Sequence, residues 1–344
     1  MRHVNIPIFI PHLGCPNQCI FCNQRYISGT VDFDVTQVRA LIEETLCTVA
    51  DGDTCEIAFF GGSFTGIDRT LMIELLDIAE EYVRAGKIIG TRMSTRPDYI
   101  SEEIIEILNG YTITCVELGI QSMNDEVLTY LKRGHTVQDT VNAANLLKSN
   151  GYGFVGQMMI GLPTSTSQDE IYCADMICRL GAFAARIYPT VVFRKTELEE
   201  LTCNGEYIPL TLEEAVNRAA DVLRVFNNNN VECIRIGLCD SENLHSDATY
   251  VDGPNSPSIG EMVLSRLYFT NICEMIDKSS CMTEKMNLLL RCSKGKTSQV
   301  IGHRKKNILE LKNRYGFSKI SVFEDAKLED KELKLEMKEE NSCV

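Results

Sequence analysis

Short apolar runs alternate with amphipathic helical patterns along the first two-thirds of this 344-residue chain, and this alternation restricts the fold to the α/β class. The apolar runs have strand length and occupy residues 5–10, 55–60, 88–94, 114–118, 154–160 and 184–189. The helical patterns occupy residues 35–49, 69–84, 102–108, 125–131, 137–149 and 168–180. Because parallel strands need long crossover connections, the alternation predicts a parallel sheet. We expect a partial (β/α)6 barrel of the TIM type, with functional residues at the carboxyl ends of the strands, and a doubly wound open sheet as the competitor.

The pattern changes after Pro189. A helical pattern at 212–226 leads to a seventh strand-like run at 231–236, and a loop rich in Gly, Pro, Ser and Asp follows at 247–257. Beyond it we expect helices and a short strand at 319–323, which together form a small α+β extension. From residue 324 onward eight acidic and four basic residues indicate a solvated, partly frayed tail. The predicted domains are therefore 1–240, 241–323 and a charged tail at 324–344.

Composition indicates the kind of protein and the cellular compartment that the chain fits. The chain is 44% hydrophobic and 24% charged, which is enough apolar mass for a full core. Its net charge of −14 is a poor match for a general nucleic-acid binder. We find no pattern of a secretory signal and no run of about 18 apolar residues, so we expect no membrane span. The odd number of 15 cysteines then fits a reducing cytoplasm, where thiols serve as metal ligands or core residues.

Three of these cysteines, Cys15, Cys19 and Cys22, lie within eight residues on the loop that follows the first predicted strand. Thiolates so close together can converge on one metal centre, and they suit zinc or an iron–sulfur cluster. A tetrahedral zinc site needs a fourth ligand, which His12 could supply. A cluster held by three cysteines instead leaves one iron open to a ligand from outside the protein. Three buried thiols without a metal are the remaining alternative.

The spacing Cys-x3-Cys-x2-Cys, with the aromatic Phe21 before the last cysteine, resembles the motif of the radical S-adenosylmethionine (SAM) superfamily. In that family the three cysteines hold a [4Fe-4S] cluster, and the amino and carboxylate groups of S-adenosyl-L-methionine bind the open iron. An electron from the cluster cleaves the sulfonium and yields a 5′-deoxyadenosyl radical, which abstracts hydrogen from the substrate. The resemblance also implies a flavodoxin- or ferredoxin-type reductant, and it places Phe21 against the adenine.

Further motifs support the resemblance. Gly61, Gly62 and Ser63 end the second predicted strand, where glycines let a ligand approach the backbone. In the family this motif binds the SAM amino group.

The segments 117–122 and 131–136 resemble oxygen-independent coproporphyrinogen oxidases and the catalytic subunit of Elongator. By that resemblance Gln121 faces the SAM ribose and Arg133 the SAM carboxylate, which a guanidinium can bind through two parallel hydrogen bonds. Gln157 ends the next strand and is expected near the ribose, although the coproporphyrinogen oxidases carry an acidic residue there.

The resemblance to the Elongator branch covers about residues 4–265, and it has two departures. That branch carries an acetyltransferase domain downstream, for which the roughly 80 residues after Glu261 are too few. It also usually has glutamine where Cys239 stands. Since Cys239 ends a predicted strand, we expect it either to face the radical cavity as a hydrogen donor or to be a plain buried thiol.

The sequence therefore predicts a radical SAM enzyme that abstracts hydrogen from a small-molecule or peptide substrate. This substrate class is preferred because the acetyltransferase is missing and the chain is acidic. A tRNA-modifying radical SAM enzyme is the first alternative. A non-enzymatic iron–sulfur protein for electron transfer or sensing, which would hold the cluster without binding SAM, is the second.

Overall fold

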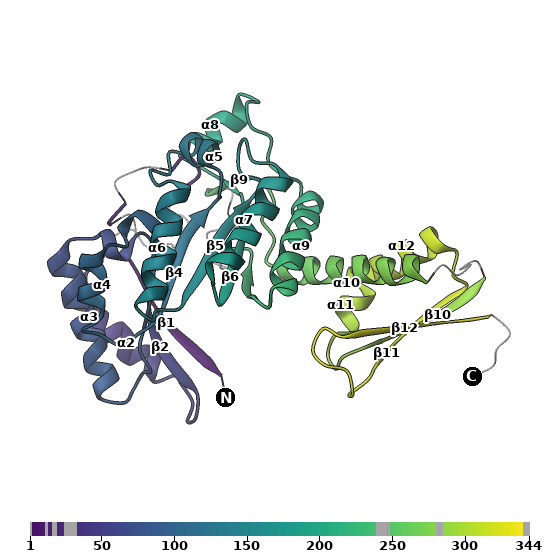
Figure 1. Ribbon diagram of the computed structural model, residues 1–344, viewed down its shortest axis with the longest axis horizontal. Helices are drawn as coiled ribbons and strands as arrows, with labels where there is room; N and C mark the ends of the chain where they lie inside the picture. Colours follow the sequence, from purple (N-terminus) through teal and green to yellow (C-terminus); the bar gives the residue numbers. More distant parts are fainter. Residues whose placement is uncertain are drawn as a thin grey trace. The chain divides into compact units, whose positions relative to one another are not determined.

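The computed structural model describes residues 2–10, 13–15, 19–23, 33–238, 246, 248–279 and 285–339 (Figure 1). The chain divides into two compact units. Unit 1 comprises Met1–Ala215 and Val225–Asn255, and unit 2 comprises Val216–Arg224 and Ser256–Val344. Among the described helices, none is both long and apolar enough to cross a membrane.

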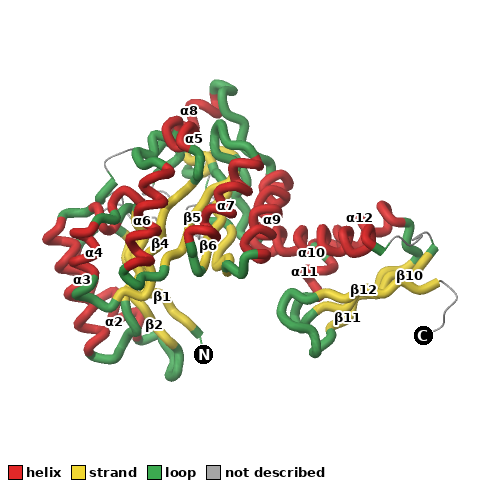
Figure 2. Tube along the Cα trace, in the orientation of Figure 1, coloured by secondary structure: helices red, strands yellow, loops and turns green. Residues whose placement is uncertain are grey.

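Unit 1 is built on a seven-stranded parallel sheet with the order β1-β2-β3-β4-β5-β6-β8 (Figure 2). Its strands are β1 His3–Phe9, β2 Thr54–Phe60, β3 Thr91–Thr95, β4 Ile113–Gln121, β5 Phe154–Ile160, β6 Ala184–Pro189 and β8 Glu232–Ile236. A doubly wound sheet reverses its strand order at a switch point, whereas this order follows the chain from edge to edge. The sheet curls into a half-barrel, which confirms the predicted TIM-like partial barrel, with seven strands in place of six.

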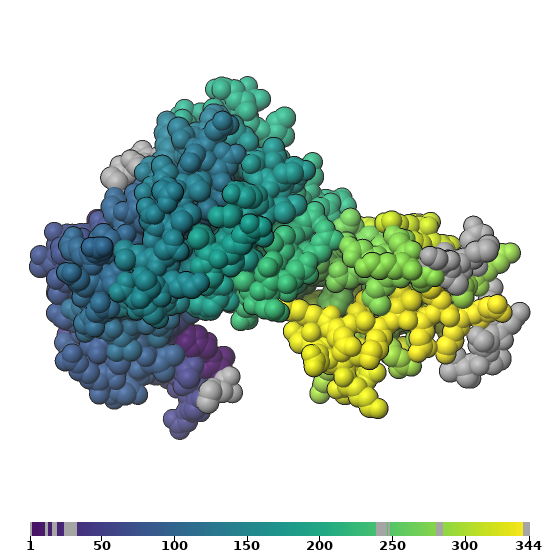
Figure 3. All heavy atoms as spheres, in the orientation of Figure 1, coloured from purple at the N-terminus to yellow at the C-terminus, as the bar shows by residue number. Residues whose placement is uncertain are grey.

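Helices connect the parallel strands. They are α2 Val38–Leu46, α3 Arg69–Arg84, α4 Glu102–Leu108, α5 Asp125–Tyr130, α6 Val137–Ser149, α7 Ser167–Leu180 and α9 Leu212–Asn228, with 3-10 turns at Val35–Gln37, Phe64–Gly66 and Pro97–Tyr99. In the ribbon diagram α6 and α7 lie in front of β4 and β5 (Figure 1), and teal atoms form the near surface over that part of the chain (Figure 3), so helices cover this face of the sheet. Helix starts follow from sequence, because Asp68, Ser101 and Thr136 accept backbone hydrogen bonds as N-caps.

Three short elements of unit 1 have no counterpart in the sequence prediction: β7 Val192–Phe193, β9 Tyr250–Asp252 and α8 Glu197–Cys203. A pair of two- and three-residue strands is too short to show a period. They matter because they fix part of the cysteine loop. The backbone N–H of Leu198 donates to the carbonyl of Ile20 at 2.9 Å, and both side chains lie in one buried cluster with Val192.

Unit 2 is a three-stranded sheet of order β11-β10-β12, formed by β10 Met286–Cys292, β11 Lys319–Glu324 and β12 Leu333–Glu339. It packs with α10 Ile259–Lys278, α11 Thr297–Ile301 and α12 Lys306–Tyr315 around one hydrophobic cluster, and a 3-10 turn lies at His303–Lys305. The structure differs from the expected frayed tail, because β12 pairs antiparallel with β10. Alternation of Leu333, Leu335 and Met337 with charged residues places one apolar face of β12 on the core, and this outweighs the acidic composition.

Candidate functional site

The cysteine loop lies directly on the glycine turn after β2. The Cys15 Sγ atom is 3.6 Å from the Ser63 hydroxyl. A Cβ atom added to Gly14, whose φ is +74°, would lie 2.4 Å from the Ser63 carbonyl oxygen. A Cβ atom added to Gly62 would lie 2.7 Å from the Leu13 carbonyl oxygen. Only glycine allows this approach of two backbones, which explains why the two motifs occur together.

Cys19 is held by Arg133. The Nη1 atom of Arg133 donates to Cys19 Sγ at 3.4 Å, and Nη2 donates to the Gly119 carbonyl at 2.9 Å. The backbones are also joined, since the Ile20 N–H donates to the Leu131 carbonyl at 3.2 Å. The Arg133 Nε atom is buried and has no hydrogen-bond partner within the described part of the chain. A guanidinium therefore stands beside a thiol with one donor still available.

Cys22 and Phe21 complete the described part of the loop. The Cys22 N–H donates to the Cys19 carbonyl at 3.0 Å, and Phe21 packs against the cluster that contains Ile20. Over residues 2–10, 13–15, 19–23 and the longer described stretches, no three His, Cys, Asp or Glu side chains are grouped so that they could hold a metal ion. Ligation by the three cysteines therefore stays a prediction.

Gln121, the last residue of β4, and Gln157, in the middle of β5, form a closed amide pair. Each side-chain NH2 donates to the other's carbonyl oxygen, at 3.0 Å and 2.7 Å. Gln121 has a φ of +66° and follows a register shift between β4 and β5, and this backbone conformation is uncommon outside glycine. Irregular backbone of this kind clusters at functional sites, so the prediction of both residues as a ligand-facing pair keeps its physical basis.

Two residues near the loop were not predicted as site residues. Arg96 is 2% exposed and pairs with Asp98 at 2.7 Å, while its Nη1 atom has no partner in the described chain. His135 is buried, and its Nε2 atom lies 3.3 Å from the Ile120 carbonyl. Burial, with Arg133 and Arg96 nearby, lowers the pKa of His135 to about 3. His135 is thus a neutral neighbour of the guanidinium groups.

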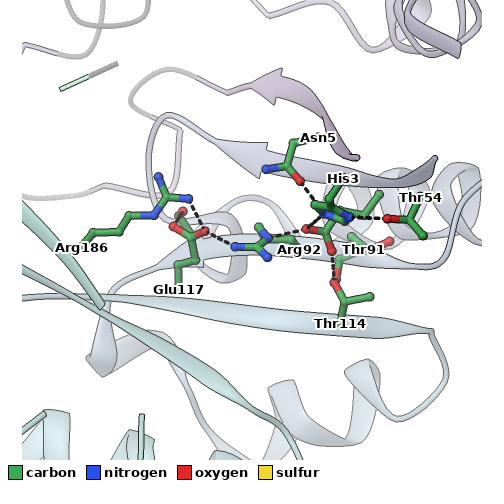
Figure 4. Close-up of polar contacts among 10 residues, drawn as sticks. His3, Asn5, Thr54, Thr91, Arg92, Thr114, Glu117 and Arg186 are labelled. Carbon is green, nitrogen blue, oxygen red and sulfur yellow. Dashed lines mark hydrogen bonds and ion pairs between the residues drawn. The ribbon is translucent and has the colours of Figure 1, made fainter. Parts of the chain in front are cut away.

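A chain of ion pairs and hydrogen bonds crosses the inner face of the half-barrel (Figure 4). From β1 to β6 it runs through His3, Glu56, Arg92, Glu117 and Arg186. His3 Nε2 lies 2.9 Å from the Glu56 carboxylate, to which Arg92 donates at 2.6 Å. The Glu117 carboxylate accepts from Arg92 at 2.9 Å and from Arg186 at 2.7 Å. One carboxylate therefore serves two guanidinium groups.

Glu56 and Arg186 in this chain of contacts hold their charges at neutral pH. Burial raises the pKa of Glu56, but hydrogen bonds from Thr114, His3 and Arg92 outweigh it and leave the pKa below its ordinary value of 4.5. Burial lowers the pKa of Arg186, and the neighbouring Tyr188 and Glu117 more than reverse this, so its pKa is raised. The inner face is thus a fixed layer of charge beneath the strand ends.

Cys239 and His12 lie outside the described residues. The expectation that Cys239 faces the cavity therefore stays a prediction, and the same holds for His12 as a metal ligand.

The residues at the strand ends fit the group that three thiols and a guanidinium would bind. The backbone cradle leaves no room for a Cβ atom, and the buried Arg133 donor without a described partner suits a carboxylate group of a cofactor bound beside a cluster. Fold and site together define a half-barrel of parallel strands whose candidate site lies at the carboxyl ends of those strands.

The family follows from comparison with known proteins. Residues 9–176 match the family model described as the Radical SAM superfamily, and residues 183–268 match the Radical_SAM C-terminal domain. The chain belongs to the radical SAM superfamily and is an enzyme of that class, which uses a [4Fe-4S] cluster and S-adenosylmethionine. The zinc alternative and the non-enzymatic alternative are thereby set aside.

The relatives include proteins of the Elongator type, as predicted. The chain is 29% identical over 233 residues to the Uncharacterized protein MJ0486 of Methanocaldococcus jannaschii, covering 63% of this chain and 70% of that one. It is 34% identical over 157 residues to the tRNA uridine(34) acetyltransferase of the same organism, covering 45% and 29%. The archaeal Methanocaldococcus infernus Elp3 shares the fold, with a TM-score of 0.60 at 24% identity over 81% of this chain and 64% of that one. The chain thus spans less than a third of the acetyltransferase.

Proposed function

We propose that Cys15, Cys19 and Cys22 bind the cluster, and that the enzyme abstracts hydrogen from a small molecule or peptide. When bound, the cluster and SAM supply a 5′-deoxyadenosyl radical. The observation that carries the assignment is the position of Arg133, which contacts Cys19 Sγ and the end of β4 with the same guanidinium. That geometry supports one site built from the loop after β1 and the strand ends.

Each remaining residue has a proposed task in holding SAM. Arg133 binds the carboxylate through its buried Nε edge, because that donor has no partner among the described residues. Gly61, Gly62 and Ser63 accept the amino group against the turn after β2. Gln121 and Gln157 exchange their mutual hydrogen bonds for the ribose hydroxyls, which costs little since hydrogen bonds replace hydrogen bonds. Phe21 covers the adenine.

A radical SAM enzyme needs a reductant and a substrate. The proposed reductant is a flavodoxin- or ferredoxin-type protein. Cys239 is proposed to donate a hydrogen atom to the product radical, and one electron from the reductant with one proton from solvent returns the resulting thiyl radical to the thiol.

A tRNA substrate is the second candidate, and a specific observation favours it. The curated relatives of this chain include tRNA uridine(34) acetyltransferases. The net charge of −14 argues against it, because a phosphate backbone is bound chiefly by excess positive charge. A gel shift with bulk tRNA at low and moderate salt separates the two. Binding that survives moderate salt would favour tRNA.

The central test is anaerobic reconstitution, dithionite reduction and measurement of 5′-deoxyadenosine by mass spectrometry. Calorimetric titration of SAM into the same protein gives a readout independent of turnover. Arg133→Gln should weaken SAM binding at least tenfold, since a charge-assisted hydrogen bond contributes about 1.5–3 kcal/mol. The matched control is Arg179→Gln on α7, whose side chain is 71% exposed. Unchanged SAM binding in Arg133→Gln, or no 5′-deoxyadenosine under several reductants, would contradict the proposal.

A further inference from the structure

Two arginines stand side by side on the inner face of the half-barrel. Arg186 on β6 and Arg235 on β8 are Cα partners in neighbouring parallel strands, so their side chains leave the same face of the sheet. That face is the inner one, because the Arg186 guanidinium reaches Glu117 on β4 and lies 5.9 Å from the ring centroid of Phe60 on β2. Like charges directly opposite each other destabilise a sheet, so this pair needs a compensating group.

The carboxylates that are buried on this face are already engaged. Glu56 pairs with Arg92, and Glu117 is shared by Arg92 and Arg186. Glu232, the register partner of Ala184, leaves the same face, but its side chain is exposed. No acidic side chain in the described part of the chain contacts Arg235, whose Nη1 atom donates to the Leu238 carbonyl at 3.4 Å. Among the arginines of this face, Arg235 therefore has no acidic partner within the described residues.

A buried hydrogen-bond donor on Arg186 also lacks a partner on this face. Arg186 is 8% exposed, yet its Nε atom has no hydrogen-bond partner among the residues that the structure describes. Buried guanidinium donors are nearly always paired, so an unpaired one marks a position for a ligand atom. Its Nη1 atom is used, since it donates to the Tyr188 hydroxyl at 3.2 Å. Arg186 is also the register partner of Gln157 on β5, which places the free donor beside the proposed SAM-binding pair.

We propose that Arg235 and the Nε edge of Arg186 form a binding site for a carboxylate or phosphate group of the substrate. An oxyanion here would receive charge-assisted hydrogen bonds from two guanidinium groups and would give Arg235 an acidic partner. The site is confined to β6 and β8, one strand away from Gln157, so it can fix a substrate next to the radical source. This inference rests on the proposed function, because it takes the inner face of the half-barrel as the substrate cavity.

The test measures anion binding directly. Reconstituted, anaerobic enzyme is equilibrated by dialysis with radiolabelled inorganic phosphate or succinate, with chloride keeping the ionic strength constant. The two probes distinguish a phosphate-bearing from a carboxylate-bearing substrate. We expect one of them to bind with 1:1 stoichiometry, and Arg235→Gln to weaken that binding at least tenfold. The anion affinity of Arg235→Lys should lie between those of the wild type and Arg235→Gln, because lysine keeps the charge and loses the planar guanidinium. Arg179→Gln, on the outer helix α7, should bind as the wild type does.

Two results would overturn the inference: neither anion binds the wild type above the chloride reference, or Arg235→Gln binds as tightly as the Arg179→Gln control. Arg235 is half-exposed on an edge strand, so the variant is expected to fold, and far-UV circular dichroism verifies this. The readout is independent of SAM cleavage. Arg235-dependent anion binding without any release of 5′-deoxyadenosine would refute the proposed function and leave the anion site standing.

Discussion

Replacing Glu117 with glutamine removes the one negative charge that Arg92 and Arg186 share, and it should destabilise unit 1 by about 3–5 kcal/mol. The Glu117 side chain is 5% exposed and accepts from the two guanidinium groups at 2.9 Å and 2.7 Å. Glutamine has nearly the same volume, so no cavity forms and the loss is electrostatic. Because solvent cannot replace the missing carboxylate, the expected cost is that of breaking a buried ion pair rather than a surface one.

The assay must separate the two compact units, since a single transition is not guaranteed for a chain of more than one unit. Hydrogen exchange read by mass spectrometry on peptides from β4 follows unit 1 alone, and urea unfolding gives the free energy of the whole chain. The matched control is Glu81→Gln, which breaks an exposed pair with Arg39 and should change stability little. If Glu117→Gln exchanged as slowly as Glu81→Gln, the reasoning that this carboxylate holds the inner layer together would be refuted.

Three further outcomes are expected. The pKa of His135 is lowered from its ordinary value of 6.5 to about 3, so the free energy of unfolding should fall by about 1.4 kcal/mol for each pH unit below 6.5. The same measurement on His135→Gln should give a smaller slope. The pKa of Glu56 is lower in the folded protein than its ordinary value of 4.5, so Glu56 stabilises the fold above pH 4.5 and loses this contribution as the pH falls through its folded-state pKa. In an acid titration of unfolding free energy, Glu56→Gln should lack this loss. Gly62→Ala brings a Cβ atom to 2.7 Å from the Leu13 carbonyl, so iron content after reconstitution should fall, whereas Gly110→Ala, with 3.3 Å as its nearest contact, should retain it. Equal iron content in the two alanine variants would contradict this reading of the cradle.

Much of unit 1 could be predicted because its signals are local. The bounds of α3, α4 and α6 match the predicted ranges, since capping residues and apolar periodicity mark both ends of each helix. Strand β4 extends to Gln121, beyond the predicted end at residue 118, because it continues through a register shift that no pattern announces. Strands β10 and β12 were missed for a different reason. Their pairing joins distant segments, and charged residues on the exposed face of β12 concealed its period of two.

The site divides in the same way. The cysteine loop and the glycine turn are short motifs, so residue spacing alone predicts them as site segments. Arg96, His135 and the arginine pair on β6 and β8 carry no comparable signal, because their meaning depends on strand register and on burial. Two arginines in separate strand-like runs look alike in sequence whether they meet or face opposite sides of a sheet.

The sharing of Glu117 between Arg92 and Arg186 ties three strands of the barrel wall to one another. A chimera that took β4 alone from a homologue without this carboxylate would leave Arg186 without its acidic partner. Because Arg92 also pairs with Glu56 on β2, recombination within the superfamily should succeed when β2, β3, β4 and β6 are exchanged as a block.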